Sequence, residues 1–228
     1  PNNEHKSSVL KGTVTKQQLS ELYSQYMYPK RKPARIIYSR ILGEAPNGKC
    51  PFCGYCDATT LDHFLPKSKF PLLTVTPFNL VPSCRDCNSG KGADVALSKG
   101  DQILHPYYDH DALVGTQWVS AHVTHGSPAT VKFYVDPPLH WNPVQKLRVV
   151  SHFNDNKLAK RYAIQAADHL STLRETLGIC FTAQGAEGVR FHLAAQAEAE
   201  RKKYVNSWQA AMYTALANDE WFYTEGYA

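Results

Sequence analysis

The sequence lacks the features of several common protein classes. None of its apolar runs approaches the roughly 18–20 residues that a membrane-spanning helix needs. It contains no internal repeat and no low-complexity tract, and residues 1–12 lack the apolar stretch of a secretion signal. We therefore expect a soluble, intracellular protein without a membrane partner.

The composition is that of an ordinary globular protein, but its charge is unevenly distributed. With 228 residues, of which 43% are hydrophobic, the chain can form one large domain or two small ones. Residues 1–49 hold nine Lys or Arg and three Asp or Glu, whereas residues 93–228 hold twelve and fourteen. The basic charge is densest over residues 30–35. Such a basic arm suits the binding of a polyanionic substrate. The alternative interpretation is a flexible, solvent-exposed N-terminal segment that binds nothing.

Cysteine is sparse, and four of the six cysteines form two Cys-x-x-Cys pairs inside one short segment. Each pair can clamp one edge of a tetrahedral zinc ion. In a reducing compartment this spacing favours structural zinc over reduced or disulfide-linked pairs. Cys56 is close enough to compete as a ligand, but it breaks the two-plus-two pattern. The predicted zinc ligands are Cys50, Cys53, Cys84 and Cys87.

Side chains suited to a hydrolytic metal site lie within and directly after this bracket. His63 is a natural general base because its ordinary pKa lies near neutrality. Asp62 and Asn88 offer the hard oxygen ligands that Mg²⁺ or Mn²⁺ prefers. If residues 60–64 form a strand, Asp62 and His63 point to opposite faces, so they serve one phosphate from two sides or through a bend. Each residue alone more often has a structural role, as a surface hydrogen bond or a helix start.

The order of these residues resembles the HNH endonuclease motif, in its form with Asn at the third position. The match covers residues 50–92. The resemblance implies a ββα-metal fold, in which two strands and a helix surround one divalent cation. It also implies that His63 is the general base and that Asp62 and Asn88 are the metal ligands.

The resemblance assigns roles to further residues. Asn79 matches the middle Asn, which in the family orients the loop and the base. Lys91 matches a basic residue near the phosphate, and Lys67 and Arg85 are further candidate substrate contacts. His105 is either a buried structural residue, which we favour, or a residue that supports the site or contacts substrate.

The sequence around and after the motif resembles a narrower group, the HNH subunit of Septu-type bacterial antiphage systems, including those attached to retrons. The segments that carry this resemblance are DHFLPKSKFPLL and PFNLVPSCRDCNSGKG, followed by ILHPYYD. This resemblance implies an ATPase partner that restrains the nuclease until infection. For a retron-attached system it also implies a reverse transcriptase with its nucleic acid. The substrate would be DNA or an RNA such as tRNA, in the bacterial cytoplasm.

Two other functions compete with this one. A restriction-like DNA endonuclease acting alone would carry a DNA-reading module, and the sequence contains none that we recognise. A non-catalytic zinc module that binds nucleic acid or a partner protein would not need a base, a carboxylate and an amide together. We therefore favour the Zn²⁺-stabilised, Mg²⁺- or Mn²⁺-dependent nuclease.

The predicted fold is α+β: a ββα-metal core with a structural four-cysteine zinc site, embedded in a mostly helical chain with one added hairpin. Hydrophobic spacing predicts a helix capped by Thr15, and a short helix near Cys84 or Asp86. Further helices are expected over residues 34–42, 155–177 (stopped by Gly178) and 189–218, and a hairpin over 117–135. The expected domains are a basic arm (1–49), the nuclease core (50–105) and a helical region that docks a partner (106–228).

Overall fold

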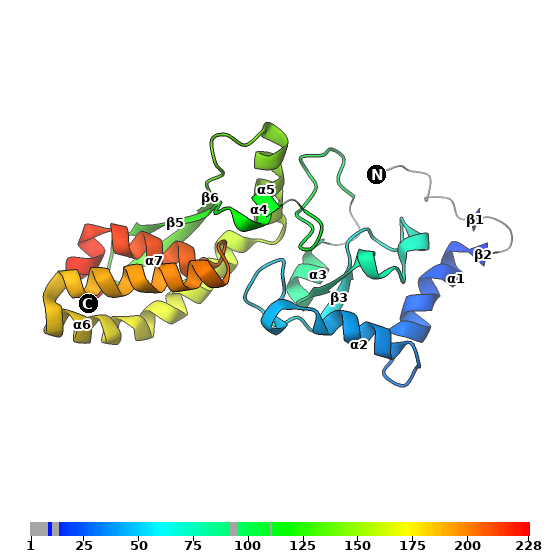
Figure 1. The fold of residues 1–228 in the computed structure, drawn as a ribbon, viewed down its shortest axis with the longest axis horizontal. Coiled ribbons are helices and arrows are strands. Elements are labelled where there is room, and N and C mark those ends of the chain that lie inside the picture. The colour runs from blue at the N-terminus through cyan, green and yellow to red at the C-terminus, as the bar shows by residue number, and fades with distance from the viewer. Residues whose placement is uncertain (1–8, 11–13, 92–94, 110) are drawn as a thin grey trace. The chain divides into compact units, whose positions relative to one another are not determined.

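The computed structural model describes residues 9–10, 14–91, 95–109 and 111–228 (Figure 1). These residues form a mixture of helices and small antiparallel sheets, and they divide into two compact units, Pro1–Tyr107 and Tyr108–Ala228. Within the described residues, no helix is both long enough and apolar enough to cross a bilayer.

The first unit combines short strand pairs with helices and single turns. It contains β1 (Val9–Leu10), β2 (Val14–Thr15), α1 (Lys16–Glu21), η2 (Leu22–Met27), α2 (Arg35–Gly43), η3 (Pro46–Gly48), β3 (Thr60–His63), η4 (Pro71–Leu73), η5 (Pro77–Asn79), β4 (Leu80–Ser83) and α3 (Arg85–Lys91).

The helix predicted after Thr15 is confirmed: α1 runs to Glu21, and the helical stretch continues as η2 to Met27. Thr15 caps α1 through a capping box, in which its hydroxyl accepts a bond from the Gln18 amide and the Gln18 side chain accepts one from the Thr15 amide. Beyond Glu21 the chain widens into the π-helical turn η2, which brings Tyr23 and Met27 onto a buried face.

Strands β3 and β4 pair antiparallel, and α3 follows β4 directly. In this register Thr60 faces Ser83 and His63 faces Leu80. The short helix expected near Cys84 is thereby confirmed as α3. One face of the strand pair packs on a cluster of buried side chains from η2, α2 and the strands: Tyr23, Met27, Tyr38, Leu61 and Leu80.

The second unit packs a β-hairpin against helices. It contains α4 (Asp111–Gly115), β5 (Val119–Thr124), β6 (Thr130–Val135), α5 (Pro143–Asp155), α6 (Leu158–Lys203), α7 (Trp208–Asn218) and η6 (Phe222–Gly226). The predicted hairpin is confirmed, with Val119 opposite Val135 and Thr124 opposite Thr130.

The long helix α6 corrects two expectations from the sequence. The helix predicted to stop at Gly178 runs on, and the chain reverses only at Gly185, whose φ of 64° lies in the left-handed region (Figure 1). Leu177 and Val189 on either side of that turn are fully buried. Tertiary packing therefore outweighs the cost of about 1 kcal/mol that a glycine adds inside a helix.

Helix α5 had not been predicted, although its start carries a recognisable signal. Asn142 and Gln145 form a capping box, with Pro143 in the first turn. The helical region expected over 189–218 is interrupted before Trp208, where Ser207 caps the separate helix α7. The buried Asn206 side chain accepts bonds from the Trp118 and Val119 amides and ties this break to β5.

Candidate functional site

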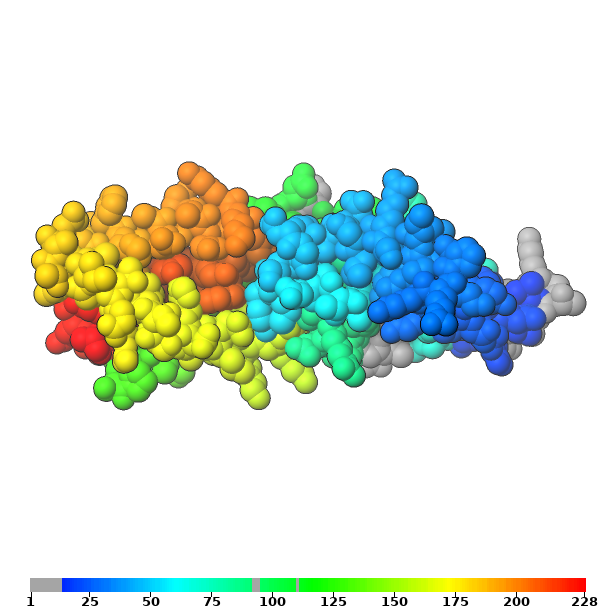
Figure 2. All heavy atoms as spheres, turned by 90° about the horizontal axis from the view of Figure 1, so that it is seen from below, coloured from blue at the N-terminus to red at the C-terminus, as the bar shows by residue number. Residues whose placement is uncertain are grey.

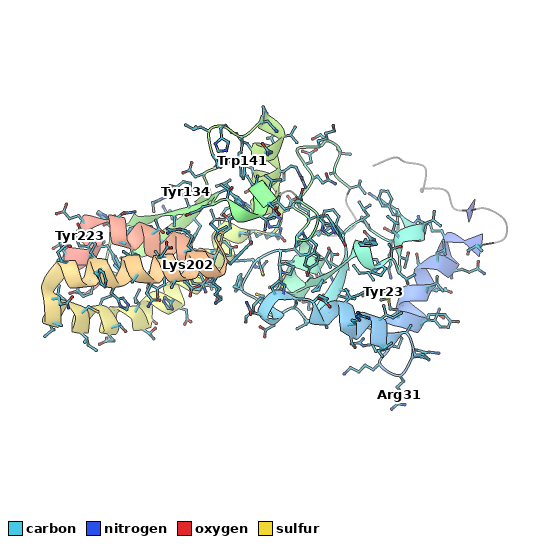
Figure 3. The ribbon with its side chains drawn as sticks, viewed as in Figure 1. Tyr23, Arg31, Tyr134, Trp141, Lys202 and Tyr223 are labelled. Atoms are coloured by element: carbon cyan, nitrogen blue, oxygen red, sulfur yellow. The ribbon has the colours of Figure 1, made fainter. Side chains whose placement is uncertain are left out.

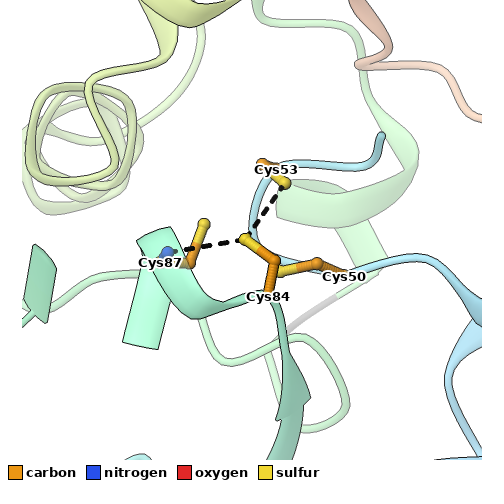
Figure 4. Close-up of side chains that lie close together, drawn as sticks. All are labelled: Cys50, Cys53, Cys84 and Cys87. Carbon is orange, nitrogen blue, oxygen red and sulfur yellow. Dashed lines mark hydrogen bonds between the residues drawn. The ribbon is translucent and has the colours of Figure 1, made fainter. Parts of the chain in front are cut away.

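Four buried cysteines meet in the first unit (Figure 4). Their Sγ atoms all lie within 4.8 Å of one another, and those of Cys53 and Cys84 are 4.0 Å apart. A tetrahedral zinc ion with Zn–S bonds of about 2.3 Å places its sulfurs about 3.8 Å apart. The set predicted from the sequence could therefore hold zinc. Cys56 does not belong to this group.

The local sequence shapes the first cysteine pair into a tight turn. The Gly54 amide donates to the Cys50 carbonyl at 2.7 Å, and the Cys50 amide donates to the Cys56 carbonyl at 2.8 Å. Gly54 has a φ of 75°, which glycine adopts at little cost. Hydrogen bonding from Cys53 lowers the pKa of Cys50 to about 7, which favours the thiolate form that binds zinc.

Strand β3 presents its polar side chains to different neighbours, as the alternation of a strand requires. Thr60 and Asp62 are directed to α3, where they meet Asn88 and Lys91. His63 is instead bonded to Thr74 in the loop between the strands. The structure therefore separates the candidate base from the candidate carboxylate ligand, as expected for a strand.

Asp62 and Lys91 form a buried ion pair. Lys91 Nζ lies 2.7 Å from Asp62 Oδ2 and donates a second bond, also 2.7 Å, to the His63 carbonyl. The side chains are only 7% and 13% exposed. Burial raises the pKa of Asp62 and lowers that of Lys91, while their mutual attraction opposes both shifts. Each charge therefore depends on the other for compensation.

Asn88 is held on the same face of β3. Its Nδ2 donates to Thr60 Oγ1 at 3.0 Å and lies 3.5 Å from the Leu61 carbonyl. With the amide nitrogen engaged in this way, the Oδ1 oxygen is the atom that could ligate a cation. Thr60 was not singled out from the sequence, although its position two residues before Asp62 in a strand places it on the same face.

The His63 imidazole is oriented by a backbone carbonyl. Its Nε2 lies 2.8 Å from the Thr74 oxygen, and because a carbonyl only accepts, Nε2 carries the proton. Nδ1 is then the nitrogen with a lone pair. The pKa of His63 is lowered to about 4, mainly by burial and to a smaller extent by the charges of Lys67 and Lys91, while the hydrogen bond to Thr74 opposes the shift. The ring is therefore neutral, and able to accept a proton, at pH 7.

Asn79 fastens the loop that carries Thr74. Its Oδ1 accepts a bond from the Leu65 amide at 2.7 Å, and its Nδ2 donates to the carbonyls of Leu65 and Leu73 at 2.9 and 3.2 Å. Asn79 is buried, and it bonds to the residue next to the one that orients His63. This arrangement lets Asn79 hold the loop that orients the candidate base, His63, without touching it.

Tyr23 is a neighbour of His63 that the sequence did not reveal. The two rings meet edge to face with centroids 4.5 Å apart, and the Tyr23 hydroxyl donates to the Leu61 carbonyl at 3.2 Å. The sequence signal was the hydrophobic spacing of the helix after Thr15, which predicts a buried face but does not say what packs against it.

The other predicted site residues lie in differing surroundings. Lys67 Nζ sits 5.2 Å from the Tyr23 ring centroid, and Arg85 is exposed at the start of α3. His105 is buried, as the structural interpretation favoured, and its ring packs 4.3 Å from that of Phe64. Gly92, which ends the motif, lies outside the described residues.

One curated relative covers nearly the whole chain. Protein ea31 of Escherichia phage lambda is 37% identical over 229 aligned residues, which span 95% of this chain and 77% of ea31. The chain belongs to the ea31 family. The name of that relative states no activity, so membership by itself assigns none.

A second relative shares a shorter part of this ea31-family chain. Septu protein PtuB of Bacillus thuringiensis is 38% identical over 71 residues, which amount to 29% of this chain and 27% of PtuB. The likeness anticipated from the sequence is thus present, but partial. No model of a known protein family matches the chain. No solved structure matches it.

Two side chains of this ea31-family protein carry the types of oxygen ligand that a divalent cation prefers. Mg²⁺ and Mn²⁺ take carboxylate and amide oxygens, which Asp62 and Asn88 supply on neighbouring elements. One carboxylate oxygen is already paired with the Lys91 ammonium group. A cation at this position must therefore use the second carboxylate oxygen or displace Lys91.

Proposed function

We propose that this protein is a metal-dependent endonuclease of the HNH type that hydrolyses phosphodiester bonds in nucleic acid. The observation that carries the proposal is the setting of His63. It is a neutral imidazole whose Nε2 is held by a carbonyl, and its strand also bears Asp62. Asn88 is bonded to that same strand, and the cysteine cluster brackets the whole element.

Each residue of the site would have its own role in this reaction. His63 Nδ1 would take a proton from the attacking water, and its pKa of about 4 keeps it in the accepting form at neutral pH. Asn79 and Thr74 would keep the ring in this orientation. Asp62 and Asn88 would hold Mg²⁺ or Mn²⁺, which when bound neutralises phosphate charge and stabilises the leaving oxygen. The zinc would be structural, because four cysteines leave no open coordination position.

A cleavage panel tests the proposal. The purified chain with Mg²⁺ or Mn²⁺ is offered plasmid, single-stranded DNA and total tRNA. Loss of a general base typically lowers the rate by about 10²–10⁴-fold, so His63→Ala should be nearly inactive. His140→Ala, which changes an exposed histidine of the second unit, is the matched control and should cleave normally. Wild-type cleavage by His63→Ala would refute the assignment.

We further propose that the nuclease is a defence effector restrained by an ATPase partner. The support is the partial similarity to Septu protein PtuB. Deleting residues 189–228 would be a poor test of partner docking. That deletion would destroy buried core, including Val189, Leu193 and Trp208, and would unfold the second unit.

Point substitutions on α6 are a better test of docking. Ile179 and Phe191 are 73% and 72% exposed, so replacing them with Glu should leave the unit folded. Co-purification with an ATPase encoded beside this chain should fail for the double variant if these side chains bind it. Unchanged co-purification would exclude this surface. If the wild-type chain retains no ATPase either, the partner proposal itself is wrong.

A further inference from the structure

The segment between Glu21 and Glu44 has an unusual composition. Residues 22–43 contain five Lys or Arg and four Tyr, and no Asp or Glu. A segment without acidic side chains repels cations and attracts a polyanion. The tyrosines are the feature that a simple phosphate-binding arm would not need.

The cations and rings of this segment are interleaved. Lys32 Nζ lies 5.4 Å from the Tyr26 ring centroid, and the Arg35 guanidinium lies 3.9 Å from that of Tyr38 and 5.9 Å from that of Tyr28. Whereas Tyr38 is buried, Tyr26 and Tyr28 are each 53% exposed. Two aromatic side chains are therefore presented to solvent among positive charges.

The most basic part of the segment projects outward. Lys30, Arg31 and Lys32 are all exposed, in the stretch that joins η2 to α2. Arg31 points away from the body of its unit at the end of this loop (Figure 3). Figure 2 shows the segment, in blue, spread over the surface of one face.

One buried ring, that of Tyr23, connects this surface to the candidate site. Tyr23 stacks on Tyr28 with centroids 6.2 Å apart and planes inclined by 30°, and it also meets His63 edge to face. Lys67 adds a cation over the same ring. A strand that stacks on Tyr28 would therefore lie one buried ring away from the candidate base.

The exposed rings discriminate between forms of nucleic acid. In a duplex the faces of the bases are stacked on one another, and only phosphates and groove edges are accessible. In a single strand the faces are open, and they stack on aromatic side chains whatever the base. Basic residues alone would serve either form, whereas exposed tyrosines among them serve the single strand.

We propose that this tyrosine patch, defined as Tyr26, Tyr28, Lys30, Arg31 and Lys32, binds single-stranded nucleic acid. Unstacked bases lie on the two rings, and the three cations contact phosphates. The inference rests on the proposed nuclease function and deepens it, because it makes an unpaired strand, loop or overhang the substrate class. It applies equally to DNA and RNA, whose bases have the same faces.

Binding can be measured apart from cleavage. The His63→Ala variant, without added divalent cation, is titrated into fluorescein-labelled oligonucleotides of roughly 20 nucleotides, long enough for one or two binding sites. The arms are single-stranded DNA, single-stranded RNA and the matching duplexes, at several salt concentrations. Tyr26→Ala with Tyr28→Ala is compared with Tyr134→Ala, which removes a tyrosine of the second unit that is 42% exposed.

The expected result is single-strand binding at least about tenfold tighter than duplex binding, with loss of most of this preference in the double tyrosine variant. Replacing Lys30, Arg31 and Lys32 with Ala should weaken the binding of single strands and duplexes alike and reduce the salt dependence of binding. Replacing the exposed Lys202 and Lys203 with Ala is the control and should change neither. Equal binding of both forms, unaffected by the tyrosines, would overturn the proposal.

The failure of this inference is distinguishable from failure of the proposed function. If the wild-type chain cleaves while the tyrosine variant cleaves and binds equally well, the nuclease stands and the patch is refuted. If single strands bind through the tyrosines but nothing is cleaved, the patch stands without the nuclease. If no oligonucleotide binds, the patch proposal falls, and the exposed Ile36 and Ile37 beside it point to a protein partner.

Discussion

The ring of Tyr23 meets the imidazole of His63 edge to face, with centroids 4.5 Å apart and planes inclined by 71°. The contact joins residues forty positions apart in the sequence, one from the π-helical turn η2 and one from the end of β3. Because Tyr23 is also bonded to the Leu61 carbonyl, it fixes the N-terminal arm against the strand that carries the candidate base.

Substitutions of Tyr23 should separate its ring from its hydroxyl. Tyr23→Phe loses one hydrogen bond, about 1 kcal/mol of unfolding free energy, and keeps the ring, so cleavage should be near normal. Tyr23→Ala should cost about 3–5 kcal/mol and also slow cleavage, because His63 loses a wall of its pocket. Urea unfolding and cleavage rates, measured where both variants are folded, check this. Equal rates for the two variants would show that the ring does not position His63.

Loss of Lys91 should destabilise the first unit. Lys91→Met leaves the Asp62 carboxylate buried without its counter-charge, which typically costs about 3–5 kcal/mol. Asp62→Asn with Lys91→Met should cost less than the sum of the two single changes, because both charges are then gone. The measurement is the free energy of unfolding of the four proteins in urea.

The same variants test whether a cation competes with Lys91. If Mn²⁺ binds at Asp62, it should raise the melting temperature of Lys91→Met more than that of the wild type, and should not stabilise the double variant. A non-additive cycle with no response to Mn²⁺ would mean that the pair is only structural and that the carboxylate holds no metal. A strictly additive cycle would contradict the energetic coupling of the pair itself.

Zinc should be present in the purified chain at one ion per molecule. Cys84→Ser should lose it and melt at a lower temperature, since a structural zinc site typically contributes about 10 kcal/mol or more to folding. Cys56→Ser is the matched control, because Cys56 lies outside the cluster, and it should keep both zinc and stability. Elemental analysis measures the zinc content of each variant, and thermal melts measure its stability. Equal zinc loss in both variants would contradict the assigned ligand set.

Stability should fall in mild acid through His169 in the second unit. Burial lowers the pKa of His169, opposed by the charges of Glu200 and Asp168, and its Nε2 lies 2.6 Å from the Tyr213 hydroxyl. Because the folded-state pKa lies below the unfolded value, the unfolded chain binds more protons as the pH falls through about 6.5. The melting temperature should therefore drop from pH 8 to pH 5, and the drop should be smaller for His169→Gln. An identical pH dependence for both proteins would exclude His169 as its source.

Local patterns in the sequence were sufficient wherever the determining contacts are short in range. The Thr15 cap, the short helix after Cys84 and the turn that joins β5 to β6 all follow from residues within a few positions of one another. Gly178 was misread because a glycine weakens a helix only slightly, whereas the buried residues beyond it continue the same packed face. The reversal at Gly185 depends on a φ that composition does not reveal.

The chemical inventory of the candidate site was readable from the sequence alone: four thiols at zinc spacing, with His63, Asp62, Asn79 and Asn88 in or beside the bracket. Spacing and residue chemistry are properties of the chain itself. Only the tertiary structure decided that Lys91 folds back onto Asp62, that Thr74 holds His63, and that Tyr23 packs against it. Those partners lie between 11 and 40 positions away, and each pairing depends on how η2, β3 and α3 pack, a condition that no local pattern encodes.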